Sequence, residues 1–137
     1  MGGLVPGASR RPGRRDGLRG VGTADDLAPV EACRVYVERL RRAGADARIT
    51  EYAGARYGFD RPGAGPARHN PREQNASRCV WEERPEGHLV SRDTGRPFSL
   101  DDPCVVRGGT FGSDPVAYRE ALGAVKALVT TEARPSP

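Results

Sequence analysis

The sequence has few of the residues that most often reveal a function. Its three cysteines show no Cys-x-x-Cys spacing, so a zinc site is not indicated. No uninterrupted apolar run approaches the roughly 20 residues that a membrane-spanning helix needs. Lys126 is the single lysine, and only two histidines are present. We therefore expect no zinc site and no membrane-spanning segment, and 137 residues allow one domain at most.

Positive charge is concentrated at the N-terminus. Residues 1–20 hold five arginines and one acid, Asp16, which gives this segment a net charge of +4. Of the 22 basic and 18 acidic groups in the chain, the remaining residues therefore keep 17 of each. Frequent glycine and the lack of an amphipathic period predict a disordered Arg/Gly-rich tail, with a second tail at residues 131–137. A basic arm that contacts nucleic acid or an acidic membrane is the alternative, but no aromatic residue interleaves the arginines, so we expect neither partner.

A strand, a helix and a second strand are indicated before residue 53. Residues 18–22 have the pattern of a short strand, and residues 47–52 alternate apolar and polar side chains as a half-buried strand does. Between them, apolar residues recur at three- and four-residue steps, which predicts a helix that follows a cap at Asp26 and ends at Gly44. Strand, helix and strand in this order make a βαβ unit, so we predict an α/β fold with a mostly parallel sheet.

Residues 61–111 show no sustained periodicity. They are rich in proline, glycine, arginine and aspartate, and only residues 79–82 have the pattern of a short strand. We therefore expect a long irregular insert. The C-terminal helix is better indicated: residues 114–130 carry an apolar stripe after a cap at Ser113 or Asp114.

Two short motifs follow the two predicted strands. Residues 22–29 (Gly-Thr-Ala-Asp-Asp-Leu-Ala-Pro) place Asp25 on a loop, and residues 52–60 (Tyr-Ala-Gly-Ala-Arg-Tyr-Gly-Phe-Asp) come at the end of the second strand. In α/β-hydrolases the triad occurs in the chain order nucleophile, acid, histidine, with the acid and the histidine on loops after strands. Over residues 20–130, with softer matches beyond the second motif, the sequence resembles the C-terminal half of the dienelactone hydrolase family.

The resemblance assigns roles by position. Asp25 occupies the position of the triad acid, and Tyr57 occupies the position of the triad histidine. A phenol does not accept and return a proton at neutral pH as imidazole does. The family's nucleophile is a serine or cysteine well before the acid, yet no Gly-x-Ser-x-Gly or Gly-x-Cys-x-Gly motif precedes Asp25. Ser9 lacks the second glycine of such a motif, so we assign no nucleophile.

The resemblance also implies a fold and an activity. The fold is a partial α/β-hydrolase fold, made of the C-terminal strands and helices of a mostly parallel sheet with the irregular insert. The activity is hydrolysis of a small carboxylic ester or lactone, with no metal and no cofactor. Because the triad is incomplete, we expect a truncated, catalytically incomplete protein, a pseudoenzyme in the cytoplasm, with a partner as the possible source of the N-terminal half of the fold. The alternatives are a non-catalytic binding module and an esterase with an improvised site.

The two histidines and three cysteines can be interpreted from their local sequence. His69 and His88 are the candidates to replace the missing imidazole, and each has the sequence context of an exposed loop histidine. Cys33 falls on the apolar face of the predicted helix. Cys79 and Cys104 flank the insert; they either pair or remain free thiols, and free thiols are the default in a reducing cytoplasm.

Overall fold

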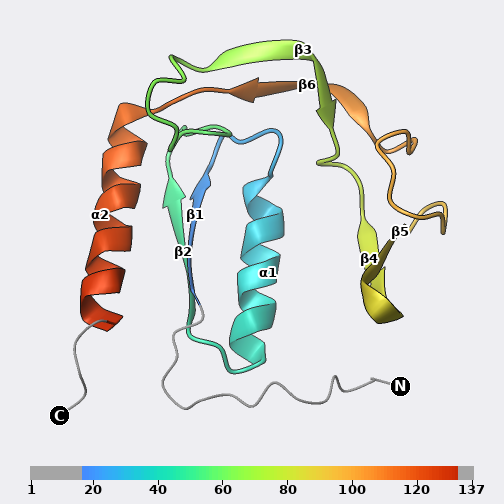
Figure 1. Ribbon diagram of the computed structural model, residues 1–137, viewed down its shortest axis with the longest axis horizontal. Coiled ribbons are helices and arrows are strands. Elements are labelled where there is room, and N and C mark those ends of the chain that lie inside the picture. The colour runs from blue at the N-terminus through green and yellow to red at the C-terminus, as the bar shows by residue number, and fades with distance from the viewer. Residues whose placement is uncertain (1–16, 133–137) are drawn as a thin grey trace.

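The computed structural model describes residues 17–132. Most of both predicted tails, including Ser9, lies outside the described residues. Figure 1 shows the elements, which are in chain order β1 (Gly17–Gly22), α1 (Val30–Arg42), β2 (Ala47–Tyr52), β3 (Arg68–Asn75), β4 (Trp81–Arg84), the 3₁₀ turn η1 (Pro85–Gly87), β5 (His88–Ser91), β6 (Val106–Phe111) and α2 (Pro115–Glu132). Neither of these helices is long and apolar enough to cross a membrane, a finding that covers the described residues only.

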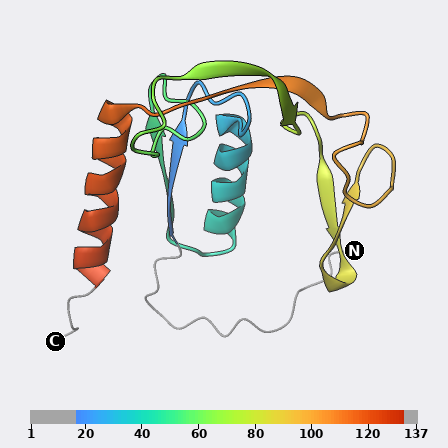
Figure 2. The same ribbon diagram turned by 45° about the horizontal axis from the view of Figure 1, so that its top comes forward.

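The first three elements form the βαβ unit that the local pattern indicates. β1 and β2 pair in parallel, and α1 is the crossover between them. Val30 and Val37 are the buried residues of α1. In both Figure 1 and Figure 2, α1 lies on one side of the two-stranded sheet and α2 lies on the other.

A small apolar core lies between this sheet and α2. Tyr52 at the end of β2 and Phe59 in the loop beyond it have ring centroids 5.1 Å apart. Ala55 and Ala117 are buried with them, and Ala121 packs against the cluster. The C-terminal helix therefore makes its contact with the core through small residues near its N-terminal end.

The predicted cap of the C-terminal helix is observed, but its apolar stripe is not buried. Asp114 Oδ1 accepts hydrogen bonds from the backbone N–H groups of Val116 and Ala117, both at 3.0 Å, which is how an N-cap side chain satisfies the first turn. Leu122 and Val125 are 38% and 49% exposed. A sheet of two strands is too narrow to cover a second face of an 18-residue helix.

The predicted mostly parallel sheet is wrong. The described residues form three separate two-stranded sheets; β1–β2 is parallel, whereas β3–β6 and β4–β5 are antiparallel. A partial α/β-hydrolase sheet is therefore not observed. The prediction failed because local sequence pattern indicates the type of each element but not its pairing partner. The strands β3 and β6 pair although more than thirty residues separate them in the sequence.

The predicted irregular insert is also wrong, because it contains β3, β4, β5 and β6. The strand β3 (Arg-His-Asn-Pro-Arg-Glu-Gln-Asn) has no β-branched or aromatic residue, so its sequence does not resemble a strand. It also contains Pro71, which cannot donate to a ladder. The register with β6 shifts between Asn70 and Gln74, the interval that holds this proline.

Residues 76–105, which we call the arm, lie between β3 and β6 in the sequence and contain the β4–β5 hairpin. Of the two alternatives for Cys79 and Cys104, the structure has the disulfide, with Cα atoms 5.1 Å apart. Cys33 is a free, half-buried cysteine on α1.

Candidate functional site

The loops that follow β1 and β2 lie against each other. The N–H of Thr23 donates to the carbonyl of Tyr52 and the N–H of Ala24 donates to the carbonyl of Ala55, both at 3.0 Å. Gly22 permits this approach, because a Cβ at its position would overlap the carbonyl group of Ala55. Parallel strands end at the same edge of their sheet, so the two motifs singled out in the sequence are neighbours in space.

Asp25 organises its own loop. Its Oδ1 accepts hydrogen bonds from the N–H groups of Leu27 at 2.9 Å and Ala28 at 2.8 Å. This is the local turn that a short acidic side chain makes with the backbone two and three residues ahead. Within residues 17–132, no histidine side chain is hydrogen-bonded to this carboxylate. The carboxylate of Asp25 therefore holds the backbone of its own loop and orients no imidazole of the described residues.

Asp26 was predicted to cap α1, and that prediction is wrong. The helix begins after Pro29 without a side-chain cap, while Asp26 reaches β6, where the N–H and the hydroxyl of Thr110 donate to its Oδ1 and Oδ2 at 2.9 Å each. Arg56 Nη1 lies 3.9 Å from Oδ2. Partial burial alone would raise the pKa of Asp26, but the hydrogen bonds from Thr110, followed by the charge of Arg56, outweigh it and lower the pKa below its ordinary value. Asp26 thus fastens the first loop to the β3–β6 ladder.

Tyr57 lies on the second loop with its side chain 44% exposed. Its carbonyl accepts a hydrogen bond from the N–H of Gly112 at 3.1 Å, and the residue forms an isolated parallel bridge with Phe111. Its hydroxyl has no hydrogen-bond partner within residues 17–132, and Asp25 is not bonded to it. The structure brings the Asp25 and Tyr57 loops together without joining the two side chains.

A cavity of about 250 Å³ lies beside Tyr57. Its apolar walls include Leu27 from the first loop and Phe111 from β6, and its polar groups are Tyr57, Arg61 and Glu73. The arrangement combines an apolar floor with a hydroxyl, a cation and a carboxylate, which is the usual composition of a small-molecule pocket. Arg61 was not predicted from the sequence, although it lies only four residues after Tyr57 and directly follows the second motif.

The sequence suggested that His69 is an exposed loop histidine. The residue is exposed, but it lies in β3 and not in a loop. Its Nδ1 is 3.3 Å from the hydroxyl of Thr110, which itself donates to Asp26. Thr110 does not line the cavity beside Tyr57. His88, the other candidate, begins β5 in the arm. Sequence reasoning could not find the His69–Thr110 contact, because the two residues are 41 positions apart.

The described residues contain no group of three or more histidine, cysteine, aspartate or glutamate side chains that could hold a metal ion. No protein-family model, no curated protein and no solved structure matches this chain.

Proposed function

We propose that this chain is a dienelactone-hydrolase-like protein that keeps the acid-bearing loop of the family's site but does not hydrolyse esters on its own. The observation that carries the proposal is the contact between the loops after β1 and β2, with Asp25 on one and Tyr57 on the other. This matches the order in which the family places its acid and its histidine, and the cavity beside Tyr57 adds a place for a small substrate or ligand.

Two features support the lack of turnover. Asp25 is engaged with the backbone N–H groups of Leu27 and Ala28, and Tyr57 supplies a phenol where a triad needs an imidazole that takes and returns a proton. A triad mechanism requires all three groups to act as a unit, so the carboxylate alone is not sufficient.

Hydrolysis of p-nitrophenyl acetate by the purified chain tests the proposal. We expect the wild type, Asp25→Asn and the control Asp60→Asn to hydrolyse the ester at the same rate. This rate should equal the background rate of an unrelated non-catalytic protein at the same concentration. Asp60 is a suitable control because it is exposed and lies in the same second motif. A saturable rate that falls in Asp25→Asn but not in Asp60→Asn would overturn the proposal.

Binding of a small ligand without catalysis is the second candidate, and the cavity favours it. The hydroxyl of Tyr57 and the guanidinium of Arg61 have no hydrogen-bond or ion-pair partner within residues 17–132, and these two residues line the same cavity. Leu27 and Phe111 supply apolar contact on the other walls. An aromatic or aliphatic carboxylate is the ligand that Arg61 favours, because a guanidinium binds carboxylates with two parallel hydrogen bonds, and the negative charge of Glu73 in the same cavity keeps this binding weak.

Benzoate is a suitable probe for this candidate, and calorimetry measures its binding. We expect a weak, saturable interaction that Arg61→Gln reduces by about tenfold, the equivalent of one charge-assisted hydrogen bond. Arg68→Gln serves as the matched control, since Arg68 is an exposed arginine outside the cavity lining. Equal affinity in wild type and Arg61→Gln would remove the ligand-binding candidate.

The disulfide bears on the cellular compartment of the protein. A cytoplasmic location would leave free thiols as the ordinary state, whereas the Cys79–Cys104 disulfide favours an oxidising compartment. Alkylation of free thiols at the moment of cell lysis distinguishes the two. Modification of Cys33 alone indicates that the disulfide exists in the cell, and modification of all three cysteines indicates the reduced, cytoplasmic form.

A further inference from the structure

The arm (residues 76–105) is a single excursion from the end of the β3–β6 ladder. The chain leaves the ladder after Asn75 and returns at Val106, and these two residues are partners in the ladder. Beyond this stem, β4 and β5 pair in an antiparallel hairpin. Figures 1 and 2 both show the arm on the opposite side of α1 from the β1–β2 sheet and α2.

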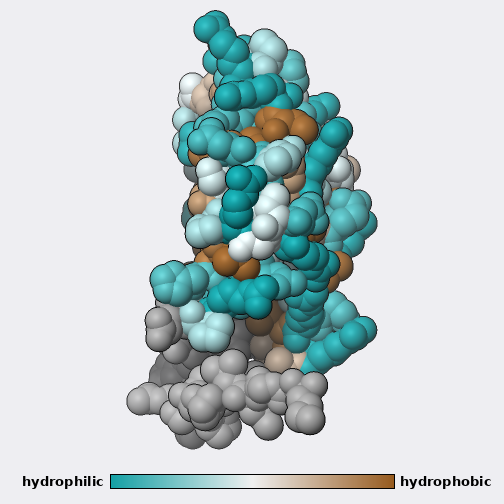
Figure 3. All heavy atoms as spheres, turned by 90° about the vertical axis from the view of Figure 1, so that its right-hand side faces the viewer, coloured by the Kyte–Doolittle hydropathy of each residue, from teal (hydrophilic) through white to brown (hydrophobic). Residues whose placement is uncertain are grey.

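The arm has almost no apolar core. Among its described side chains, the buried residues are Ser91 and Asp102, which are both polar. Four of its large apolar residues are exposed by 44% to 49%, namely Val80, Leu89, Phe98 and Leu100, whereas Trp81 and Val90 are half-buried. In Figure 3, where this end of the molecule faces the viewer, hydrophobic atoms form small, separated spots on a mostly hydrophilic surface. Burial of apolar surface, the main stabilising contribution in most folds, therefore contributes little to the arm.

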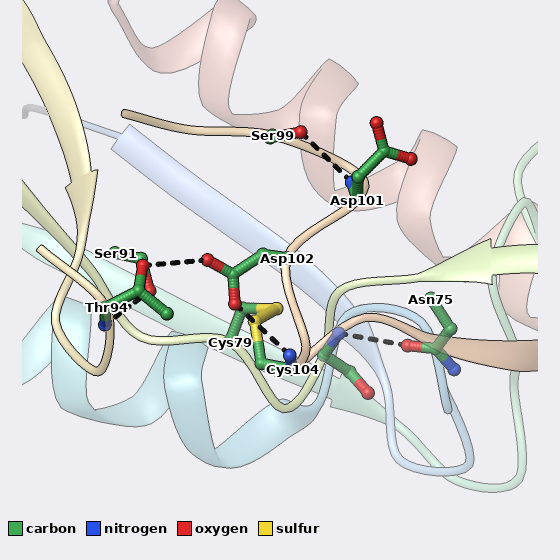
Figure 4. Close-up of a disulfide and its surroundings, with 9 residues drawn as sticks. Asn75, Cys79, Ser91, Thr94, Ser99, Asp101, Asp102 and Cys104 are labelled. Carbon is green, nitrogen blue, oxygen red and sulfur yellow. Dashed lines mark hydrogen bonds between the residues drawn. A yellow bond between two sulfur atoms is a disulfide. The ribbon is translucent and has the colours of Figure 1, made fainter. Parts of the chain in front are cut away.

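A disulfide and a polar network take the place of that core. Cys79 and Cys104, 25 positions apart, join the two ends of the arm. Next to this bond the carboxylate of Asp102 accepts hydrogen bonds from the N–H of Cys104 and the hydroxyl of Thr94, both at 3.2 Å, and it also bonds the side chain of Ser91 (Figure 4). The network closes around the covalent bond, so its geometry depends on the two cysteines staying together.

The rest of the molecule does not depend on the disulfide in the same way. At the stem, the buried amide of Asn75 donates to the carbonyls of Asp26 and Gly108, at 3.0 Å and 2.8 Å. These bonds join the β3–β6 ladder to the Asp25–Asp26 loop and lie outside the segment that the disulfide closes. The apolar core around Tyr52 and Phe59 also lies outside it.

We propose that the arm is a redox-controlled element, ordered when Cys79 and Cys104 are bonded and released when they are reduced, while the remainder of the described fold stays intact. Reduction breaks the S–S bond with two electrons and two protons from a dithiol of the thioredoxin class. One thiol of the dithiol forms a mixed disulfide with Cys79 or Cys104, and its second thiol then displaces the cysteine, so the dithiol leaves as its own disulfide. Both cysteines are half-buried rather than enclosed, which leaves the bond accessible to such a reductant. This inference does not rest on the proposed hydrolase ancestry.

Trp81 provides a direct probe, because it is the only tryptophan in the chain and lies in the arm two residues after Cys79. Its ring centroid is 4.7 Å from that of Phe98. The experiment compares the full chain before and after treatment with dithiothreitol, by Trp81 emission, by trypsin cleavage at the arm arginines with fragments identified by mass, and by helical circular dichroism. Closing a loop across 25 positions lowers the number of conformations open to the arm by a factor of roughly several hundred.

We expect reduction to shift Trp81 emission to longer wavelength and to accelerate cleavage within the arm by at least about tenfold, with the helical signal unchanged. The double variant Cys79→Ser/Cys104→Ser should behave like the reduced protein without reductant, whereas Cys33→Ser should keep the full difference between the two redox states. Identical emission and cleavage in both states would overturn the proposal. So would loss of the helical signal together with arm opening, because the arm would then not be a separate element.

Discussion

Replacing Asp26 with alanine tests how the first loop is held to the β3–β6 ladder. The carboxylate of Asp26 accepts the backbone N–H and the hydroxyl of Thr110, at 2.9 Å each, across 84 positions of sequence. Alanine removes both acceptors and leaves the partly buried N–H of Thr110 without its partner. The variant should therefore destabilise the fold without changing its apolar core.

The magnitude follows from the two hydrogen bonds and the exposure of the acceptor. Hydrogen bonds to a charged group contribute roughly 1.5 to 3 kcal/mol each when they are shielded from water. The side chain of Asp26 is 40% exposed, so water replaces part of what the variant loses. We therefore expect Asp26→Ala to lower the free energy of unfolding by about 2 kcal/mol.

Urea unfolding followed by helical circular dichroism measures this loss, because the helical signal reports the fold outside the arm. Asp60→Ala is the matched control: Asp60 is exposed, and its loss should change the free energy of unfolding by less than about 0.5 kcal/mol. If Asp26→Ala were no more destabilising than Asp60→Ala, the assignment of Asp26 as the fastening group would be wrong.

The same carboxylate makes stability depend on pH. The pKa of Asp26 is lower in the folded protein than in the unfolded chain, so the folded state holds its proton less readily. The stabilisation is complete above the unfolded pKa, about 4, and is lost as the pH falls through the folded pKa. The pKa of Asp102 is also lowered, chiefly by the hydrogen bond from the N–H of Cys104, so this carboxylate adds to the loss of stability in acid. The loss of stability between pH 5 and pH 2 should be smaller in Asp26→Asn than in the wild type.

Two further substitutions test the core and the contact between the loops. Burial, followed by the charge of Glu120, raises the pKa of Tyr52. The stabilisation that Tyr52 contributes is therefore complete below the unfolded pKa and is lost as the pH rises through the folded pKa. Tyr52→Phe should reduce the loss of helical signal above pH 10. Gly22→Ala should lower the free energy of unfolding by about 3 kcal/mol, because its Cβ overlaps the carbonyl group of Ala55. Gly123→Ala, in open space on α2, should raise the free energy of unfolding by up to about 1 kcal/mol. Similar urea midpoints for the two glycine variants would contradict the close contact of the loops.

Local pattern predicted those elements whose neighbours are close in sequence. The helix α1, the strand β2 and the cap at Asp114 depend on residues within a few positions, and all three are present. The strand–helix–strand order also predicted that β2 pairs in parallel with β1. These successes share one cause, which is that the hydrogen bonds and apolar contacts concerned are encoded by spacing along the chain.

The failures concern contacts that no local pattern carries. Asp26 had every feature of a helix cap, yet its partner Thr110 lies on a strand that the sequence did not reveal as one. The strand β3 was missed because it contains Pro71 and no β-branched residue, and it forms only through pairing with β6. In the site, Asp25 and Tyr57 were found by their motifs, whereas Arg61 was missed because a lone arginine carries no pattern of its own.

The mass of the intact protein shows whether the Asp25 loop activates a nucleophile in this chain. The Cys33→Ser variant, which removes the free thiol outside the disulfide, is incubated with p-nitrophenyl acetate and quenched in acid. We expect no site-specific acetyl adduct, and the same trace labelling in Cys33→Ser with and without Asp25→Asn. Stoichiometric addition of one acetyl group to a single hydroxyl or thiol, abolished by Asp25→Asn, would contradict it.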